Sequence, residues 1–131
     1  MENIYIPLND EYPEIDFNAS TGRLLIRGTC KSFSGTNDKF FMPLVEWAKE
    51  YAKSPAQKTV IDVQLDYFGT EVSKLLLWIF RELDYIFKAG HQVCINWFYE
   101  EINTAIFEMG EEYKSVLGLP LNLIRLKKAG S

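Results

Sequence analysis

The amino-acid sequence predicts an α/β fold, a mixed sheet with helices packed mainly on one face. Two segments, residues 59–68 and 91–99, alternate apolar and polar side chains as half-exposed strands do. A sheet covered by helices on both faces would carry near-continuous apolar strands instead. Between these two strands lies a helical pattern over residues 70–89, long enough to connect parallel neighbours in one sheet.

The N-terminal part of the chain predicts an antiparallel hairpin. Two short apolar runs, residues 14–17 and 23–28, flank the segment Asn-Ala-Ser-Thr-Gly at 18–22. These residue types either bond their own backbone through the side chain or accept unusual backbone angles, so they favour a turn. A loop rich in Ser, Gly and Thr is expected to follow over residues 29–36.

A first helix is predicted from Asn37 or Asp38 to about Lys53. Its apolar side chains recur at spacings of three and four residues, which is the helical period. The buried stripe is expected to consist of Phe41, Leu44, Val45, Ala48 and Tyr51. Pro43 has no N–H group, so we expect it in or near the first turn, where no helical hydrogen bond is lost.

The remaining predicted elements supply most of the expected core. The strand over 59–68 points Ile61, Val63, Leu65 and Tyr67 inward, and the strand over 91–99 points Val93, Ile95, Trp97 and Tyr99 inward. The helix between them ends at Gly90, and its buried stripe consists of Val72, Leu75, Leu76, Ile79, Leu83, Ile86 and Phe87. A third helix over about 101–116 and a final edge strand over 119–126 complete the expected fold.

Length and composition are those of a single domain over residues 1–131. Apolar residues make up 47% of the chain and aromatic residues 15%, which supports a packed core without a metal or disulfide. A formal net charge of -4 argues against nucleic acid or an anionic membrane as the main partner. The sequence shows neither a basic leader nor a long apolar run, so a soluble cytoplasmic protein is expected.

Candidates for catalysis or metal binding are few. Cys30 and Cys94 lie far apart without a C-x-x-C motif, so two reduced, packed thiols are expected. His91, the single histidine, cannot complete a zinc site with them. The sequence contains no phosphate-binding loop, zinc-protease motif or nucleophile elbow. We therefore expect a protein that is not an enzyme and that uses no metal or other cofactor.

The acidic third helix leaves an alternative open. Its carboxylates are Glu100, Glu101, Glu108, Glu111 and Glu112. Such a group can hold a divalent cation, or form a small catalytic site with His91 or Tyr99. A solvated helix face explains the same residues without any ligand. The enzyme alternative requires a concave pocket with a strongly shifted titratable group nearby.

The junction between the strand over 59–68 and the next helix is the most informative segment. Thr70 falls at or next to the helix N-cap, where backbone N–H groups and the helix dipole attract negative charge. Capping alone explains a threonine here, with Glu71 or Ser73 helping to satisfy the first-turn N–H groups. The alternative is a phosphorylation site, since a phosphate would add about -1.5 to -2 charges at that position.

The outward face of the same helix favours a protein-binding surface. Turning about 100° per residue from Thr70 places five side chains within a quarter-turn of it, opposite the buried stripe. They are Lys74, Leu77, Trp78, Arg81 and Tyr85. Aromatic residues and arginine are typical anchors of protein interfaces. The alternative is that a neighbouring loop or a chain end covers them.

Six short motifs in a fixed order give the sequence a family resemblance. They are Y-P-E-I-D-F-N at 12–18, G-R-L-L-I-R-G at 22–28, F-F-M-P-L-V-E-W at 40–47, Y-F-G-T-E-V-S-K at 67–74, W-F-Y at 97–99 and E-M-G-E-E-Y at 108–113. Together they resemble the SiaC family of bacterial regulatory phosphoproteins over residues 12–126. The resemblance implies a fold similar to the STAS domains of anti-sigma-factor antagonists.

The resemblance also implies a function for Thr70. In SiaC-type systems a partner Ser/Thr kinase phosphorylates the threonine of a Y-F-N-T motif, and a metal-dependent protein phosphatase reverses the reaction. The unmodified form binds and activates a diguanylate cyclase, which raises cyclic di-GMP and promotes biofilm formation. Thr70 holds the position of that threonine, so the resemblance and the helix N-terminus indicate the same residue.

The sequence departs from the family pattern at several positions. Gly69 stands where the motif has Asn, and Glu71 and Val72 replace two serines. The loop over 28–34 lacks the family's arginine and proline, and only Glu100 and Glu101 remain of an acidic stretch. These differences favour a divergent member whose partner need not be a cyclase. They also leave open a constitutive binding module without a phosphorylation switch.

Overall fold

The structure, a computed structural model that describes residues 1–31 and 37–127, contains a six-stranded mixed sheet. The strand order is β1-β2-β3-β4-β5-β6, so each strand pairs with its neighbour in sequence. The pairs β1–β2 and β2–β3 are antiparallel, and the pairs β3–β4, β4–β5 and β5–β6 are parallel. The strands are β1 (Ile4–Ile6), β2 (Glu14–Asn18), β3 (Arg23–Thr29), β4 (Lys58–Tyr67), β5 (Gln92–Tyr99) and β6 (Leu121–Arg125).

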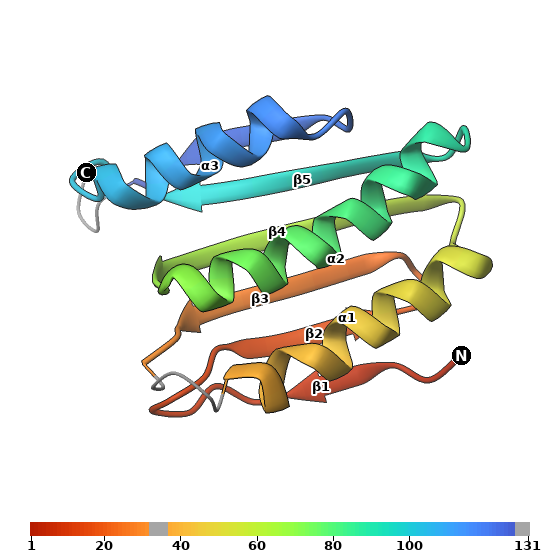
Figure 1. The fold of residues 1–131 in the computed structure, drawn as a ribbon, viewed down its shortest axis with the longest axis horizontal. Coiled ribbons are helices and arrows are strands. Elements are labelled where there is room, and N and C mark those ends of the chain that lie inside the picture. The colour runs from red at the N-terminus through yellow and green to blue at the C-terminus, as the bar shows by residue number, and fades with distance from the viewer. Residues whose placement is uncertain (32–36, 128–131) are drawn as a thin grey trace.

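Three helices in the described part of the chain lie on one face of the sheet (Figure 1). They are α1 (Asn37–Lys53), α2 (Thr70–Lys88) and α3 (Thr104–Val116). Each helix connects two parallel neighbours, as the lengths of the connections require. The predicted α/β fold with a mixed sheet and helices mainly on one face is therefore confirmed. Within residues 1–31 and 37–127, no helix has the length and apolar character of a membrane span.

The predicted hairpin is formed by β2 and β3, and its turn is held by Asn18. The Asn18 side-chain oxygen accepts hydrogen bonds from the N–H groups of Ser20 and Thr21, at 3.0 and 3.1 Å. The Gly22 N–H donates to the Asn18 carbonyl at 3.0 Å, with φ of +74° at Gly22. A Cβ at this glycine would lie 2.0 Å from the Lys58 carbonyl, so only glycine fits where the turn passes the start of β4.

The core fills the space between the sheet and the three helices. The predicted stripe of α1 is buried throughout, and that of α2 is buried except for the half-buried Phe87. Trp47 and Phe80 are also buried, although the predicted stripes of α1 and α2 did not include them. Trp47 stacks on Tyr51 with ring centroids 5.0 Å apart, and the Tyr51 hydroxyl hydrogen-bonds the buried Thr59 hydroxyl at 2.7 Å.

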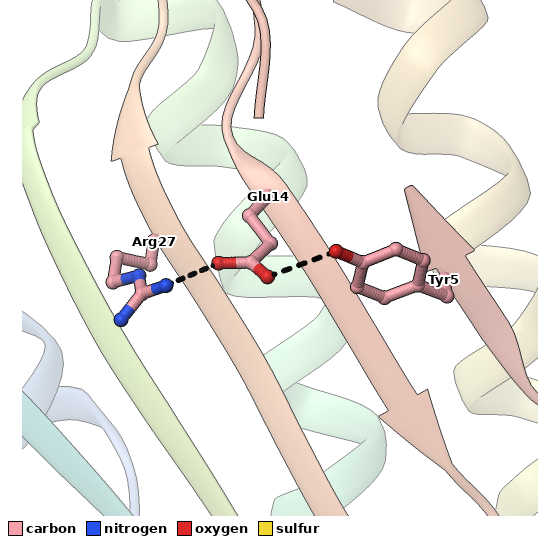
Figure 2. A network of polar contacts seen from close by, with 3 residues as sticks. All are labelled: Tyr5, Glu14 and Arg27. Atoms are coloured by element: carbon pink, nitrogen blue, oxygen red, sulfur yellow. Dashed lines mark hydrogen bonds and ion pairs between the residues drawn. The ribbon is translucent and has the colours of Figure 1, made fainter. Parts of the chain in front are cut away.

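The face of the sheet without helices carries polar side chains that bond one another across strands. Figure 2 shows Glu14 accepting hydrogen bonds from Arg27 at 2.7 Å and from Tyr5 at 3.4 Å. Further along the sheet, the amide of Asn122 donates to Asn96, and Asn96 donates to Asp62, at 3.0 and 2.9 Å. The predicted alternation of β4 and β5 is thus explained by one apolar and one wet face.

The prediction that Tyr67 points inward is wrong. Tyr67 is 60% exposed, whereas Ile61, Val63 and Leu65 of the same strand are buried as expected. The pairing of β3 with β4 shifts at this point: Gly28 pairs with Leu65 and Thr29 with Tyr67, which leaves Asp66 as an extra residue. A bulge of this kind breaks the two-residue period and turns the following side chain to solvent.

Two element boundaries also differ from the prediction. Strand β1 was not expected, because three residues at a sheet edge are too few to show alternation. Helix α3 begins at Thr104 rather than near residue 101, since the side chain of Asn103 caps it by accepting from the Ile106 N–H at 3.2 Å. The predicted final edge strand is confirmed but shortened to Leu121–Arg125, and the structure shows that it runs parallel to β5. Of the predicted loop over 29–36, residues 32–36 lie outside the described residues.

Pro43, which was expected in or near the first turn of its helix, lies in the second turn of α1 counted from Asn37. Its missing N–H group leaves the carbonyl of Lys39 without a helical partner. Both residues are exposed, so solvent can satisfy that carbonyl. The helix therefore tolerates proline on this side.

The two ends of α2 are built differently. Its N-cap is Gly69, which has extended backbone angles of -91° and -178° and no side chain to cap the first turn. Its C-terminus closes with hydrogen bonds from the Ala89 and Gly90 N–H groups to the carbonyls of Tyr85 and Phe87, both at 3.0 Å. Gly90 has φ of +105°, a conformation that ends helices and favours glycine. This confirms the predicted stop at Gly90.

Helix α3 packs closely on β5 because Gly110 has no side chain. A Cβ built at Gly110 would lie 2.5 Å from Cδ1 of Trp97 and 2.6 Å from Cδ2 of Leu123. The close approach lets the indole N–H of Trp97 donate to the Ile106 carbonyl of α3 at 2.9 Å. The contact between α3 and β5 therefore leaves no space for a side chain at position 110. The packing offsets the low helix propensity of glycine.

We expect Gly110→Ala to lower the free energy of unfolding by about 1–2 kcal/mol. The added methyl group overpacks the contact with Trp97, and this costs more free energy than the higher helix propensity of alanine gains. Urea denaturation measures the change. Glu111→Ala, at the exposed neighbouring position, is the control and should stay within about 0.5 kcal/mol of the wild type. A Gly110→Ala protein as stable as the wild type would show that α3 does not pack tightly against the indole of Trp97.

We expect Gly69→Asn to raise the free energy of unfolding by about 0.5–1 kcal/mol. The position has extended backbone angles and open space around a new Cβ, and asparagine is a favourable N-cap that also restricts the unfolded chain. The matched control is Gly90→Asn at the other end of α2, where φ of +105° strains any other residue and should lower stability. Equal effects of the two substitutions would contradict the capping argument.

Candidate functional site

Thr70 is exposed as the first residue of α2, next to the N-cap Gly69, which confirms its predicted position. Its hydroxyl makes no hydrogen bond to any residue within 1–31 or 37–127. The Ser73 hydroxyl does not cap the turn either, because it donates to the Thr70 carbonyl at 2.7 Å. The threonine hydroxyl is thus accessible at the positive end of a helix, and capping does not explain it.

The first turn of α2 rests on an aromatic cluster formed by Phe68, Phe80, Trp97 and Tyr113. Trp97 contacts Phe68, Phe80 and Tyr113 edge-on or tilted, with ring centroids 6.0, 6.4 and 5.3 Å away. The Tyr113 hydroxyl donates a hydrogen bond to the Ser73 carbonyl at 2.8 Å. Burial raises the pKa of Tyr113 above its usual range, so this hydroxyl stays protonated and remains a donor even at alkaline pH. The cluster fixes the turn that carries Thr70.

The five predicted outward residues of α2 follow Thr70 along the helix. Trp78 and Tyr85 are 50% and 65% exposed, and Lys74 and Arg81 are exposed. Leu77 is half-buried and packs partly against the core, so it contributes less to the surface than its position on the helix suggested. Neither Lys74 nor Arg81 forms an ion pair with any residue that the structure describes.

Helix α1 extends this surface in a way that the sequence did not predict. A hollow of about 290 Å³ lies between α1 and α2. Its lining residues are Met42, Val45, Lys49, Trp78, Arg81 and Glu82. The apolar pattern of one helix does not show which residues of another helix lie beside it. The contact between α1 and α2 therefore follows only from the three-dimensional structure.

The other candidate residues are not brought together into a site. His91 and the five glutamates around α3 are all exposed, and no cluster of metal-ligating side chains occurs in residues 1–31 or 37–127. A hollow beside Tyr99 and Glu100 measures only about 110 Å³, small for a substrate pocket. These findings do not favour the enzyme alternative.

The two cysteines are unpaired, as expected. Cys94 is half-buried and Cys30 is buried. Burial, and to a lesser degree the nearby charge of Asp66, raises the pKa of the Cys30 thiol to about 12. A thiol that stays protonated at neutral pH is a poor nucleophile, so Cys30 acts as a packed core residue.

Comparisons with known proteins identify the family and the fold. The model of the SiaC family of regulatory phosphoproteins matches residues 6–126. An uncharacterised protein of Pseudomonas aeruginosa strain UCBPP-PA14 is 23% identical over 120 residues, covering 92% of this chain and 94% of that protein. The structure of SiaC from Pseudomonas aeruginosa superposes with a TM-score of 0.84 at 21% identity, covering 96% of this chain and 100% of that chain.

A second solved structure holds a SiaC-like fold together with its partner. It is the crystal structure of the diguanylate cyclase SiaD in complex with its activator SiaC, from Pseudomonas aeruginosa. It matches with a TM-score of 0.84 and 21% identity over 94% of this chain. At this identity the likeness establishes the shared fold, while the family match over residues 6–126 establishes membership. The chain belongs to the SiaC family of regulatory phosphoproteins.

Proposed function

We propose that this protein is a non-enzymatic bacterial signalling adaptor whose binding to a partner is controlled by phosphorylation of Thr70. The observation that carries the proposal is the accessible Thr70 hydroxyl at the N-terminus of α2, on the same face as an exposed tryptophan. A kinase needs such access to its target hydroxyl. The match to a family of regulatory phosphoproteins supports the same assignment.

A phosphate on Thr70 would act on the surface that begins there. We propose that the unmodified protein binds its partner through Lys74, Leu77, Trp78, Arg81 and Tyr85. Phosphorylation would introduce about -1.5 to -2 charges at the edge of that interface. A desolvated charge without a partner costs a few kcal/mol, which corresponds to a loss of affinity of about 100-fold or more.

The proposed partners follow from the family. A Ser/Thr protein kinase and a metal-dependent protein phosphatase would set the phosphorylation state of Thr70. The output partner would be a diguanylate cyclase, by analogy with the SiaC that activates SiaD in the solved complex. The protein would then regulate cyclic di-GMP and biofilm formation from the cytoplasm. Neither nucleic acid nor a membrane is part of this proposal.

One observation favours a second candidate function, a binding module that no longer responds to phosphorylation. Glu71 places a carboxylate directly after Thr70. A fixed negative charge at this position resembles a modified residue and disfavours a kinase that recognises neutral neighbours. In that case Thr70→Ala and Thr70→Glu would bind the partner equally well. Under the phosphorylation switch, Thr70→Ala binds normally and Thr70→Glu binds more weakly.

We expect a species heavier by one phosphate, modified at Thr70, in the protein purified from its native host. Its abundance should change between two physiological states, because a switch must be set and reset. Intact-mass and peptide mass spectrometry make the measurement, and the Thr70→Ala protein from the same cells is the control. Phosphate on another residue would contradict the role of Thr70, and none in either state would favour the constitutive module.

We expect Trp78→Ala to abolish binding to the partner recovered with the wild-type protein, while the domain still unfolds cooperatively. Half of the side chain is already exposed, so the loss of stability should be about 1–2 kcal/mol. Pull-down and thermal unfolding measure the two effects. Tyr5→Ala is the control, since Tyr5 is a similarly exposed aromatic residue, 62% accessible, on the sheet face. Loss of binding together with loss of cooperative unfolding would contradict the interface.

A further inference from the structure

The tyrosine that ends β4 is exposed three residues before Thr70, at the junction between β4 and α2 (Figure 1). Tyr67 is 60% exposed, and its hydroxyl makes no hydrogen bond to any described residue. Its ring stacks on no other aromatic ring in residues 1–31 and 37–127. The fold therefore leaves much of this ring for contacts with another molecule.

The backbone around Tyr67 is held by three hydrogen bonds. The Thr29 hydroxyl donates to the carboxylate of Asp66, the residue that forms the bulge. The Asn103 side-chain amide donates to the Asp66 carbonyl at 2.9 Å, and the Cys30 N–H donates to the Tyr67 carbonyl at 3.1 Å. A bulge changes the direction in which the next side chain points. These bonds therefore fix the outward direction of Tyr67.

The two residues between Tyr67 and Thr70 leave the approach to Thr70 open. Phe68 is half-buried, and its ring meets the buried Trp97 edge-on with centroids 6.0 Å apart. Gly69 has extended backbone angles, and no atom lies within 4 Å of the position that a Cβ would take. The residue next to Thr70 therefore does not obstruct an approaching protein.

A kinase that phosphorylates Thr70 has to cover the surface around it. In this step the Thr70 Oγ bonds to the terminal phosphorus of a nucleoside triphosphate, and the bond from that phosphorus to the bridging oxygen breaks. The nucleoside diphosphate leaves, and the hydroxyl proton passes to a base of the kinase. The reacting atoms must come within about 3–3.5 Å of each other. The Thr70 side chain therefore has to enter the active site.

The distance along the chain places Tyr67 inside the area that such a kinase covers. Three residues span about 10 Å at most, even when fully extended. A transient protein complex buries about 600 Å² on each partner, which is a patch about 28 Å across. A kinase with the Thr70 hydroxyl in its active site therefore also covers Tyr67.

We propose that Tyr67 is a recognition residue for the kinase that modifies Thr70. Its ring enters an apolar pocket beside the kinase active site and thereby places the Thr70 hydroxyl. This inference rests on the proposed function, because it adds a specificity-determining residue to the phosphorylation of Thr70. A tyrosine on a fixed backbone suits this role, since it supplies a large contact area at a small loss of conformational entropy.

Position, rather than exposure alone, distinguishes Tyr67 from the other exposed tyrosines. Tyr85 is 65% exposed, but fifteen residues of helix set it about 22 Å from Thr70. Tyr5 is 62% exposed on the face of the sheet without helices, and its hydroxyl donates to Glu14 at 3.4 Å. Of these three tyrosines, only Tyr67 has both a free ring and a place beside Thr70.

The experiment uses an extract of the native host as the source of the kinase. The purified full chain is incubated with the extract and ATP labelled at its terminal phosphate. Peptide mass spectrometry gives the initial rate of phosphorylation at Thr70 over a range of chain concentrations. Tyr67→Ala should raise KM about 10-fold or more and leave the maximal rate within about two-fold, because the ring contributes to binding rather than to transfer.

Three further variants make the result specific. Tyr67→Phe keeps the ring and should behave like the wild type. Tyr67→Glu cannot enter an apolar pocket and should raise KM at least as much as Tyr67→Ala. Tyr5→Ala removes a similarly exposed tyrosine away from Thr70 and should leave KM unchanged. Thermal unfolding of each variant checks that the domain still folds cooperatively.

Three results would overturn the inference. The first is a wild-type rate for Tyr67→Ala at every concentration. The second is a lower maximal rate at an unchanged KM, which would assign Tyr67 to the geometry of the turn rather than to recognition. The third is a wild-type rate together with loss of the output partner in a pull-down, which would assign Tyr67 to the partner-binding surface.

These results leave the proposed function intact, because the wild-type chain is still phosphorylated at Thr70 in each of them. A different result would remove both. If the extract phosphorylates the wild-type chain at no residue, or only at residues other than Thr70, the switch fails and the recognition role of Tyr67 fails with it.

Discussion

The position of Thr70 depends on the packing around Trp97. This side chain, toward the C-terminal end of β5, contacts Phe68 before α2, Phe80 within α2 and Tyr113 of α3. Its indole N–H donates a hydrogen bond to the Ile106 carbonyl of α3. Gly110 allows that approach, since any side chain there would overlap the indole. Tyr113 then reaches the Ser73 carbonyl in the first turn of α2. A buried aromatic contact therefore fixes an exposed hydroxyl.

The fold followed closely from the sequence where periodicity is long and uninterrupted. The buried stripes of α1 and α2 and the inward residues of β4 and β5 were predictable because each repeats over several turns or residue pairs. Prediction failed where a tertiary event intervenes. The bulge at Asp66 exposes Tyr67, and the short edge strand β1 is defined only by its pairing with β2.

The candidate site was predictable in part, for a related reason. Thr70 and the outward residues of α2 follow from helix geometry, so the sequence places them on one face. The contribution of Met42, Val45 and Lys49 depends on how α1 packs beside α2, and no single-helix pattern contains that information. Likewise, the motif at 108–113 contains Gly110 and Tyr113. Their role in holding the first turn of α2 depends on how close α3 lies to α2, which the sequence does not show.

The strand order of the sheet has a consequence for how the protein is made. Each strand pairs with the strand before it in sequence, so the sheet can assemble from the N-terminus while the chain is still being synthesised. Thr70 leaves the ribosome well before Trp97 and Tyr113, the residues that fix its turn. A nascent chain therefore exposes Thr70 before the contacts that hold its turn in place can form. An enzyme that modified Thr70 only in this fixed turn would distinguish folded molecules from growing chains without any further signal.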